Sequence, residues 1–235
     1  MLHKTTSRGW QLEKGAGAFF FCFNLLLTVI GFEAKAQDWK TETKINVLFG
    51  LSQPLVTHGF NVEVNYIHKR LIVDFSQGVG LEFTSRLVTP DLRRQGVNVH
   101  MPWTTGFGVG YRITSWINLR AEPKWHRFEF YYDDQLKYPN TEITSYNSFT
   151  MGLGLYGSFQ PFKRKANFLS GILIAPSIRY WPTIASTLKG GQFTYYDQHT
   201  DKNEEIKTVG PGIGLTPLVI NLSIGYSFPV KKKKE

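Results

Sequence analysis

Residues 106–125 of this 235-residue chain read GFGVGYRITSWINLRAEPKW, and every second residue in each half is apolar. The first half alternates aromatic or β-branched residues with glycine, and the second alternates aliphatic residues with Asn118 and Arg120. Successive side chains of a β-strand point to opposite faces, so each half is typical of a strand with one apolar face. The stretch therefore predicts an antiparallel hairpin that turns at Thr114-Ser115-Trp116.

The same alternation recurs along most of the chain after residue 44. A period of ~3.6, which would indicate helix, fits none of these segments. In one segment Gln77 interrupts the apolar face, and beyond Pro123 the residues Phe128 and Phe130 fall out of step with the preceding apolar positions. We interpret the second change as a β-bulge, where proline is tolerated. The eight predicted strands cover residues 45–52, 60–66, 71–83, 106–113, 117–130, 148–155, 171–179 and 218–228.

The links between these segments alternate in length from the second strand onward. The short links cover residues 69–70, 114–116 and 160–167, and the long links cover residues 84–102, 131–145 and 184–211. The first link, residues 55–58, is short although its position makes it a loop. Short turns at one end and longer loops at the other are typical of outer-membrane β-barrels. The pattern predicts that both termini face the periplasm.

The residue types on the two faces indicate which face meets lipid. A soluble barrel would bury the apolar face, whereas a membrane barrel exposes it. The predicted lumenal charge network consists of Glu63, Asp74, Glu82, Arg112, Arg120, Glu122, Lys124 and Arg179. Acids and bases in equal number can pair across a narrow lumen. Aromatic residues near strand ends predict girdles at the two membrane interfaces: Tyr66, Trp103, Trp116, Tyr131, Tyr132, Tyr146, Phe159, Phe168, Trp181, Tyr226 and Phe228.

The N-terminal region has the pattern of a signal peptide. Basic residues precede the apolar run 16–32, which is shorter than the ~20 residues of a membrane helix, and Ala34-Lys35-Ala36 matches a small-x-small cleavage site. We expect the mature chain to begin at Gln37. The predicted organisation is a signal peptide (1–36), a periplasmic N-terminal segment (37–43), an outer-membrane barrel (44–228) and a basic C-terminal tail (229–235).

Composition narrows the class further. Aromatic residues make up 15% of the chain and charged residues 19%, which favours an all-β protein. The net charge is +9, of which the Lys231–Lys234 run and Glu235 contribute +3, and the rest is dispersed, so no nucleic-acid partner is expected. The single cysteine, Cys22, lies in the predicted signal peptide. The mature chain therefore needs neither a disulfide nor a cysteine-ligated metal.

Two stretches resemble a known group of proteins. The last strand, LVINLSIGYSF, ending at Phe228, is similar to the C-terminal recognition strand of outer-membrane proteins, although PVKKKKE follows it here. The hairpin of residues 106–125 resembles that of the small outer-membrane β-barrel domain shared by OmpA-like, OmpX-like and PorT-like proteins. The resemblance covers about residues 44–228. It implies the barrel fold, and its PorT-like branch implies a link to secretion across the outer membrane.

Candidate chemistry is sparse. Barrels of the lipid A deacylase type carry a His-x-Ser pair and a Glu. The nearest match in this sequence is His126 with Glu129, but position 128, where the pattern needs Ser, is Phe. His58, His68, His100 and His199 stand singly, and we expect no metal site. The glycines of residues 106–110 lack the following helix of a phosphate loop, and we expect them to make room for large neighbours. We expect no catalytic residues and no cofactor.

These observations predict an eight-stranded antiparallel up-and-down transmembrane β-barrel in the outer membrane of a Gram-negative bacterium. Eight strands leave an interior that side chains fill. We expect a non-enzymatic structural, surface-interaction or secretion-accessory protein, with outer-membrane lipid and a surface or secretion partner around it. The alternatives are a small channel or porin, a lipid A-modifying enzyme and a secreted soluble ligand-binding barrel.

Overall fold

The computed structural model describes residues 39–165, 167–197 and 199–230. The predicted signal peptide, its cleavage site and the lysine run lie outside the described residues. No helix in the described ranges is long and apolar enough to cross a membrane. The strands are β1 Thr43–Gly50, β2 Phe60–His68, β3 Leu71–Phe83, β4 Val97–Arg112, β5 Ile117–Tyr132, β6 Thr144–Gly157, β7 Ile172–Tyr180, β8 Thr183–Ser186, β9 Gln192–Asp197, β10 Lys202–Lys207 and β11 Leu218–Pro229.

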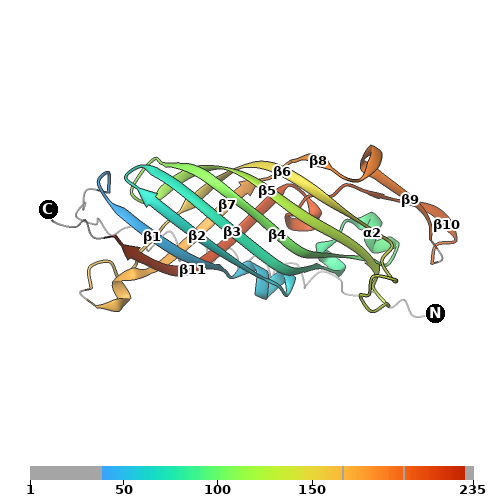
Figure 1. Cartoon of the computed structure of the whole chain (residues 1–235). Helices are drawn as coiled ribbons and strands as arrows, with labels where there is room; N and C mark the ends of the chain where they lie inside the picture. Colours follow the sequence, from blue (N-terminus) through green and yellow to red (C-terminus); the bar gives the residue numbers. More distant parts are fainter. Residues whose placement is uncertain (1–38, 166, 198, 231–235) are drawn as a thin grey trace, which may run out of the picture. The chain divides into compact units, whose positions relative to one another are not determined.

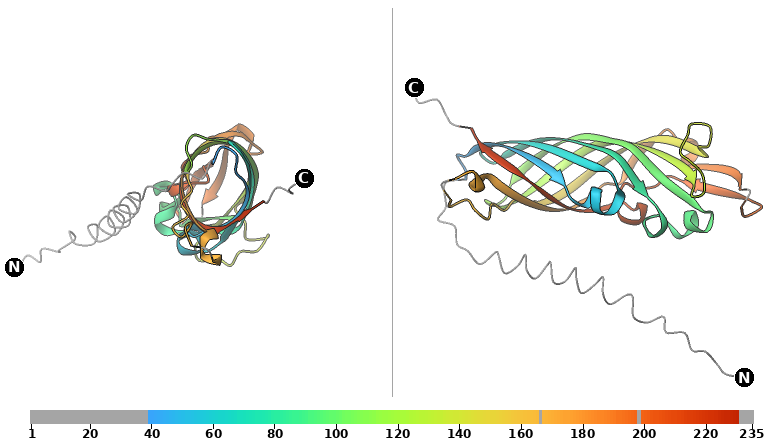
Figure 2. Two further views of the ribbon diagram at one scale, coloured as in Figure 1. Left: turned by 90° about the vertical axis from the view of Figure 1, so that its left-hand side faces the viewer. Right: turned by 90° about the horizontal axis from the view of Figure 1, so that it is seen from below.

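Eight of these strands form a closed antiparallel ring (Figure 1). Neighbours in sequence pair from β1 to β7, β7 pairs with β11, and β11 returns to β1 with Lys44 opposite Pro229. The view along the ring shows that it closes (Figure 2). The all-β class and the eight antiparallel strands predicted from the alternation are thus confirmed. β8 extends the wall from β6, and β9 with β10 forms a separate hairpin.

The two ends of the ring differ. At the turn end lie Trp39, where the described chain begins, the close turn Lys69–Arg70, the turn 113–116 and the link 158–171 with the 3-10 turn η3 Phe168–Gly171. At the loop end lie the β1–β2 link, with η1 Gln53–Thr57, and the longer links. The longer links contain η2 Ser85–Leu87, α2 Pro90–Arg94, η4 Lys189–Gly191, η5 Ile213–Leu215 and the β9–β10 hairpin. The Thr89 side chain accepts from the Leu92 amide, so α2 begins with an N-cap followed by proline.

Through the turn-end part of the ring, apolar side chains point outward. The exposed residues include Val64, Phe75, Val109, Leu153 and Leu222, while the residues between them are buried inside. A soluble protein rarely exposes so continuous an apolar surface. In this part of the ring the apolar side chains lie outside and the polar side chains inside, as expected for a membrane barrel. A soluble barrel would need apolar side chains inside and polar side chains outside.

The inward face changes phase on β3 and β4, not on β5. Gly80 has φ 65°, and the β4–β5 register shifts between His100 and Thr104. Beyond this β4 bulge, residues such as Leu81 and Met101 are buried, although Leu81 shares its parity with outward residues nearer the turn end. The predicted bulge near Pro123 is wrong, because β5 keeps one register with β6 from Ile117 to Phe130. Phe128 and Phe130 simply continue the inward face of β5.

The interior at the loop end is an apolar cluster. It joins side chains of β3, β4, β5 and β6 with residues of the long links, which fold over the ring. Its buried members are Leu81, Phe83, Val88, Leu92, Val97, Val99, Met101, Phe128, Phe130, Tyr146, Ile206, Val209 and Leu215. The predicted long links are therefore ordered parts of the fold, and β4 and β5 extend into them.

Candidate functional site: the filled barrel interior

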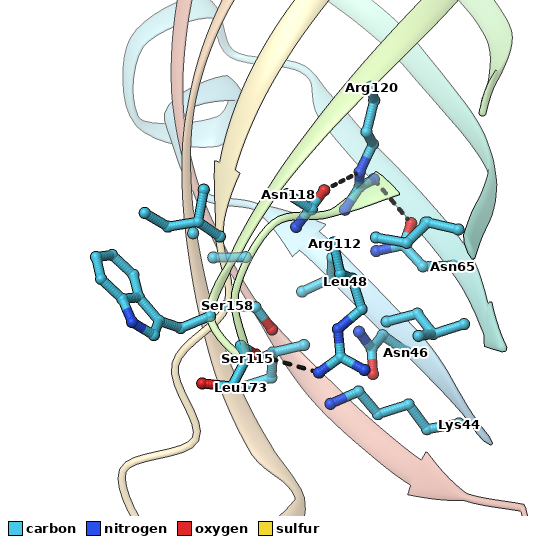
Figure 3. A pocket seen from close by; sticks show the side chains of 16 residues that line it. Lys44, Asn46, Leu48, Asn65, Arg112, Ser115, Asn118, Arg120, Ser158 and Leu173 are labelled. Carbon is cyan, nitrogen blue, oxygen red and sulfur yellow. Dashed lines mark hydrogen bonds between the residues drawn. The ribbon is translucent and has the colours of Figure 1, made fainter. Parts of the chain in front are cut away.

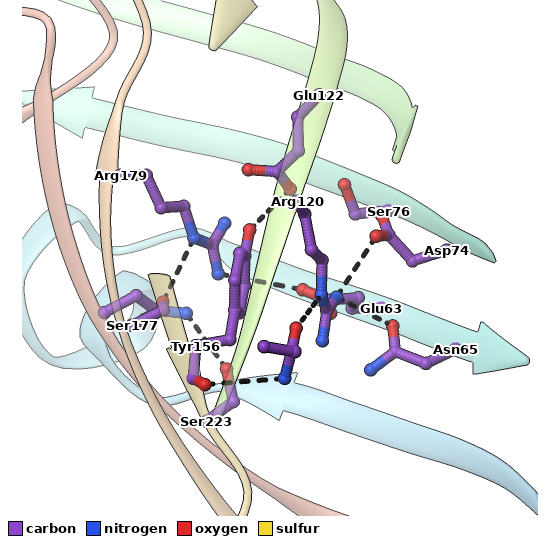
Figure 4. A network of polar contacts seen from close by, with 12 residues as sticks. Glu63, Asn65, Asp74, Ser76, Arg120, Glu122, Tyr156, Ser177, Arg179 and Ser223 are labelled. Atoms are coloured by element: carbon purple, nitrogen blue, oxygen red, sulfur yellow. Dashed lines mark hydrogen bonds and ion pairs between the residues drawn. The ribbon is translucent and has the colours of Figure 1, made fainter. Parts of the chain in front are cut away.

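The middle of the interior holds a buried network of acidic and basic side chains. Arg120 on β5 contacts Glu63 on β2 at 2.6 Å and Asp74 on β3 at 3.1 Å (Figure 4). Its guanidinium also donates to Asn65 at 3.2 Å and to Asn118 at 2.7 Å. Both carboxylates and the guanidinium are buried. Such groups are costly to desolvate unless each has a close partner. Arg120 is the shared partner of two carboxylates that come from two different strands.

A second set of contacts surrounds Tyr156. The Arg120 and Arg179 guanidinium carbons lie 3.9 Å and 4.8 Å from the Tyr156 ring centre, which fits cation–π attraction. Arg179 also lies 3.7 Å from the Glu63 carboxylate. The Tyr156 hydroxyl donates to Glu122, and the Trp181 indole donates to the same carboxylate at 3.0 Å. Aromatic rings thus fill the space between the buried charges.

Lys124 and His126 complete the network towards the loop end. The Lys124 ammonium donates to the Ser76 hydroxyl and lies 4.7 Å from the centre of the Trp181 ring. His126 is buried, and its ring nitrogens lie 2.8 Å and 2.9 Å from the hydroxyls of Thr104 and Thr150. The next inward residue of β5 is Phe128, so His126 marks the boundary between the polar interior and the apolar cluster.

Glycines on the facing strands make room for these side chains. A Cβ added at Gly108 would lie 2.4 Å from an Asp74 oxygen, and one at Gly152 would lie 1.8 Å from the Trp181 ring. Neither distance is compatible with a real side chain. The alternating glycines predicted to accommodate large neighbours have this role in the structure.

Residues 39–42 close the turn end of the interior. Arg112 donates to the Trp39 carbonyl at 3.0 Å, and its guanidinium carbon lies 5.1 Å from the Trp39 ring centre. The Glu42 carboxylate lies 3.2 Å from both Lys44 and Arg112. Burial raises the pKa of Glu42, but Lys44, Lys163 and Arg112 outweigh it, so that its pKa lies below the usual value.

The turn-end half of the interior leaves little free space. Its cavity measures about 10 Å³ and is lined by both polar and apolar side chains, among them Lys44, Asn46, Leu48 and Leu173 (Figure 3). A single water needs about 10–15 Å³. This cavity therefore has room for about one water molecule.

Seven of the eight predicted network residues lie buried inside the barrel. They form two groups, with Arg112 at the turn end and Glu63, Asp74, Arg120, Glu122, Lys124 and Arg179 in the middle. Glu82 is the exception. It follows Gly80, where the faces exchange, and it pairs with Lys137 of the β5–β6 loop.

The predicted aromatic girdles are found in part. At the turn end Tyr66, Trp116 and Phe228 are exposed, and Phe159 lies 5.5 Å from Trp116 between ring centres. At the loop end Trp181 is only 6% exposed and Tyr131 only 5%. Trp181 continues the inward parity of Arg179, so its assignment to a girdle is wrong. The remaining predicted girdle residues are Trp103, Tyr132, Tyr146, Phe168 and Tyr226, of which Tyr146 lies in the apolar cluster and Tyr132 donates to Asp197.

Several members of the network were absent from the predicted charge network, namely Lys44, Asn65, Ser76, Asn118, Tyr156 and Trp181. Parity alone could have found most of them, because Tyr156 follows Gly152 and Gly154 on the inward face of β6. The candidate pair His126 and Glu129 is not brought together. His126 points inward, whereas Glu129 contacts His100 and Arg127 at 3.2 Å and 2.7 Å.

The closed pairing and the apolar exterior define the class of the chain, a small eight-stranded β-barrel with a filled interior. No protein-family model matches the chain, and no curated protein matches it. The solved structures to which it is similar are outer-membrane proteins.

The similarity to these structures is distant. Ail of Yersinia pestis in complex with the heparin analogue sucrose octasulfate is 13% identical, with a TM-score of 0.41 over 80% of this chain and 100% of that one. A major outer membrane protein of Thermus thermophilus is 13% identical, with a TM-score of 0.42 over 80% and 99%. Ail in a phospholipid bilayer nanodisc is 15% identical, with a TM-score of 0.34 over 80% and 100%.

Proposed function

We propose that this chain is an integral outer-membrane barrel that conducts no solutes and acts through its loop end as a structural or surface-interaction protein. The observation that carries the proposal is the closed interior. Charged side chains cross the middle, residues 39–42 cover the turn end, and the apolar cluster covers the loop end. A barrel filled in this way serves as an anchor for its outer parts.

The exterior supports a membrane location. Residues such as Val109, Leu153 and Leu222 present an apolar wall, and the closed pairing of β1–β7 with β11 leaves no strand edge open beside these residues. With the short turns in the periplasm, both termini lie there and the loop end faces outward. Fractionation of cells and sequencing of the mature N-terminus test this location. A cytosolic protein that keeps Met1 would contradict it.

The loop end offers groups for contact with a partner. Leu136 and Tyr138 of the β5–β6 loop and Tyr196 of β9 are largely exposed. Aromatic residues of this kind are enriched in protein interfaces. A secretion-accessory role, implied by the PorT-like resemblance, would use the same end or the periplasmic turns to bind other envelope proteins.

Conductance in planar bilayers is the direct test of the closed interior. The folded barrel should show no steady current steps, whereas a stable channel on the nanosiemens scale would favour the porin alternative. Partner binding is tested by purification from native membranes. A loop-end variant, Tyr138→Ser, should lose a bound partner that the turn-end variant Phe168→Ser retains, because Phe168 is also exposed but lies at the opposite end.

We also infer that the barrel is not an enzyme. The nearest catalytic candidate, His126, lies inside the wall with both ring nitrogens next to threonine hydroxyls. A lipid-modifying site would need a nucleophile and its base within hydrogen-bond reach on the lipid side. Incubation with lipid A, followed by mass spectrometry of the acyl chains, tests the inference, and a changed acyl pattern would overturn it.

A further inference from the structure

The barrel wall is incomplete beside β8. The pairing of β7 with β11 ends where Tyr180 lies opposite Leu218, and the amide of Trp181 donates to the Pro217 carbonyl at 2.9 Å. Beyond this point β8 pairs with β6, and among the described strands none pairs with its other edge. In the facing segment, residues 208–217, Gly210 donates to Leu215 and Gly212 donates to Thr216, both at 2.8 Å, while Thr208 donates to Gly191 and Val209 to the Tyr146 hydroxyl. It faces β8 without forming a strand.

A cavity of about 560 Å³ lies between β8 and this segment. Its lining includes Ile184, Ala185, Leu188, Val209 and Leu215, and no charged side chain is among the described residues that line it. Val209 and Leu215 are 9% and 4% exposed and belong to the apolar cluster. The opening therefore leads from the outer surface of the wall to the apolar interior of the loop end, and its volume is that of a ligand pocket.

The register of the strands gives the depth of this opening. Ala185 lies opposite Phe149, and Phe149 lies opposite Trp125. Trp125 is exposed on the outward face and packs against Phe149 with 5.0 Å between ring centres. The next outward positions towards the loop end are Arg127 and Asn147. In the pairing register, the opening therefore neighbours the last apolar outward positions before the outward residues become polar.

We propose that this opening takes up an acyl chain of an anionic membrane lipid, which enters sideways from the outer leaflet. The inference rests on the proposed function, since it requires the exterior to face lipid. The lining also contains Thr183, Ser186 and Thr208, but its apolar residues reach the exterior through Ile184, which is 62% exposed. Lys189 and Lys207 are exposed and adjoin the lining residues Leu188 and Thr208 in the chain, where a negative headgroup would lie. The edge of β8 spans Thr183–Ser186, too short to hold a partner strand by backbone bonds alone.

Photolabelling tests the proposal. The full mature chain is folded into phosphatidylcholine vesicles that contain phosphatidylglycerol with a diazirine at the end of one acyl chain. After irradiation, mass spectrometry should find label on Val209 or Leu215 as well as on the exterior residue Leu222. Substitution Ala185→Trp fills the mouth and should reduce the label on the first two at least fivefold. The matched variant Ala121→Trp, on the outward face of β5 away from the opening, should leave it unchanged.

The outcomes separate the two proposals. Label on Leu222 without label on Val209 or Leu215 overturns the lipid-uptake inference and leaves the membrane barrel intact. Absence of label from Leu222 in a folded chain overturns the membrane barrel itself. If a phosphatidylcholine with the same diazirine labels Val209 or Leu215 equally well, the proposed preference for an anionic headgroup is wrong. Disulfide-linked dimers of the mature Ala185→Cys variant would assign the opening to a second copy of the chain instead.

Discussion

The middle and the loop end of the barrel interior lie on the same strands and are filled with opposite chemistry. On β5 the inward residues run through Arg120, Glu122 and Lys124 to His126, and then to Phe128 and Phe130 in one unbroken register. Outward residues change in the opposite direction, from Leu119 and Trp125 to Arg127 and Glu129.

Each level of the wall therefore has an interior unlike its exterior. Where the outside is apolar, the inside is charged; where the outside is polar, the inside is apolar as in a soluble protein. A slip of one residue would move every side chain to the wrong face, so this contrast specifies strand register at both levels. On β3 and β4 the exchange is made by Gly80 and the β4 bulge.

The largest effect is expected from breaking the charged middle. Arg120→Met leaves Glu63 and Asp74 buried without their guanidinium, which should lower the free energy of unfolding by about 3–5 kcal/mol. Urea unfolding in detergent micelles, followed by tryptophan fluorescence, measures it. Arg127→Met is the control, because that side chain is 35% exposed and its ion pair with Glu129 should contribute less than about 1 kcal/mol. If both variants lose the same free energy of unfolding, the buried ion pairs of Arg120 contribute no more to stability than the exposed ion pair of Arg127.

A smaller effect is expected when an arginine is placed on the outer face of the barrel, once in the apolar part and once at the polar loop end. Leu222→Arg introduces a charge into the apolar exterior and should cost about 2–4 kcal/mol. Asn147→Arg, outward at the loop end, should change stability by less than about 0.5 kcal/mol. Unfolding from lipid vesicles gives both values. If both substitutions are neutral, the exterior does not face lipid and the inside-out contrast is lost.

The apolar cluster should tolerate a change of shape that the charged middle does not. Met101→Leu keeps volume and apolar character and should cost less than about 1.5 kcal/mol. Arg120→Lys keeps the charge but removes the fork that reaches both Glu63 and Asp74, so it should cost more. The same urea titrations compare them. A larger loss for Met101→Leu would mean that packing, rather than charge geometry, governs the interior.

The smallest effect is expected at the turn end and depends on pH. Glu42 has a lowered pKa in the folded barrel, so its ionised form favours the folded state. Its contribution is fully present above its ordinary pKa of about 4.5 and is lost as the pH falls through the lower folded value. Unfolding measured between neutral and acidic pH should therefore show a steeper loss for the parent chain than for Glu42→Gln. Parallel pH profiles would argue against the closure by residues 39–42.

The strands were predictable because alternation of residue types is a local property. The eight predicted segments correspond to β1–β7 and β11, and the inward position of Arg120, Glu122 and Arg179 follows from parity. Glu82 was wrongly predicted to point into the barrel, because the positive φ at Gly80 exchanges the inward and outward faces of β3 beyond it. The backbone angle of a glycine in a strand cannot be read from the sequence. The positions of Phe128 and Phe130 were interpreted as a bulge because every apolar side chain was assumed to point out of the barrel. That assumption fails where the outside of the wall becomes polar.

The loop end was less predictable because its contacts join distant segments. Ile206 and Val209 join Phe128 and Met101 in one cluster only when the long link folds back over the ring. That no described strand pairs with the second edge of β8 likewise depends on two segments, because it follows from where β11 begins. Trp181 was assigned to a girdle for its residue type, although its parity matched Arg179.

The pairing of β1 with β11 has a consequence for the order of assembly. Lys44 and Pro229 lie nearly at opposite ends of the described chain, so the ring cannot close until the last strand has been delivered. Until then Glu63 and Asp74 stay hydrated on an open sheet, and Arg179 arrives from the seventh strand. Contacts so distant in sequence slow folding. Closure by β11 therefore completes the wall that keeps these charged groups out of water.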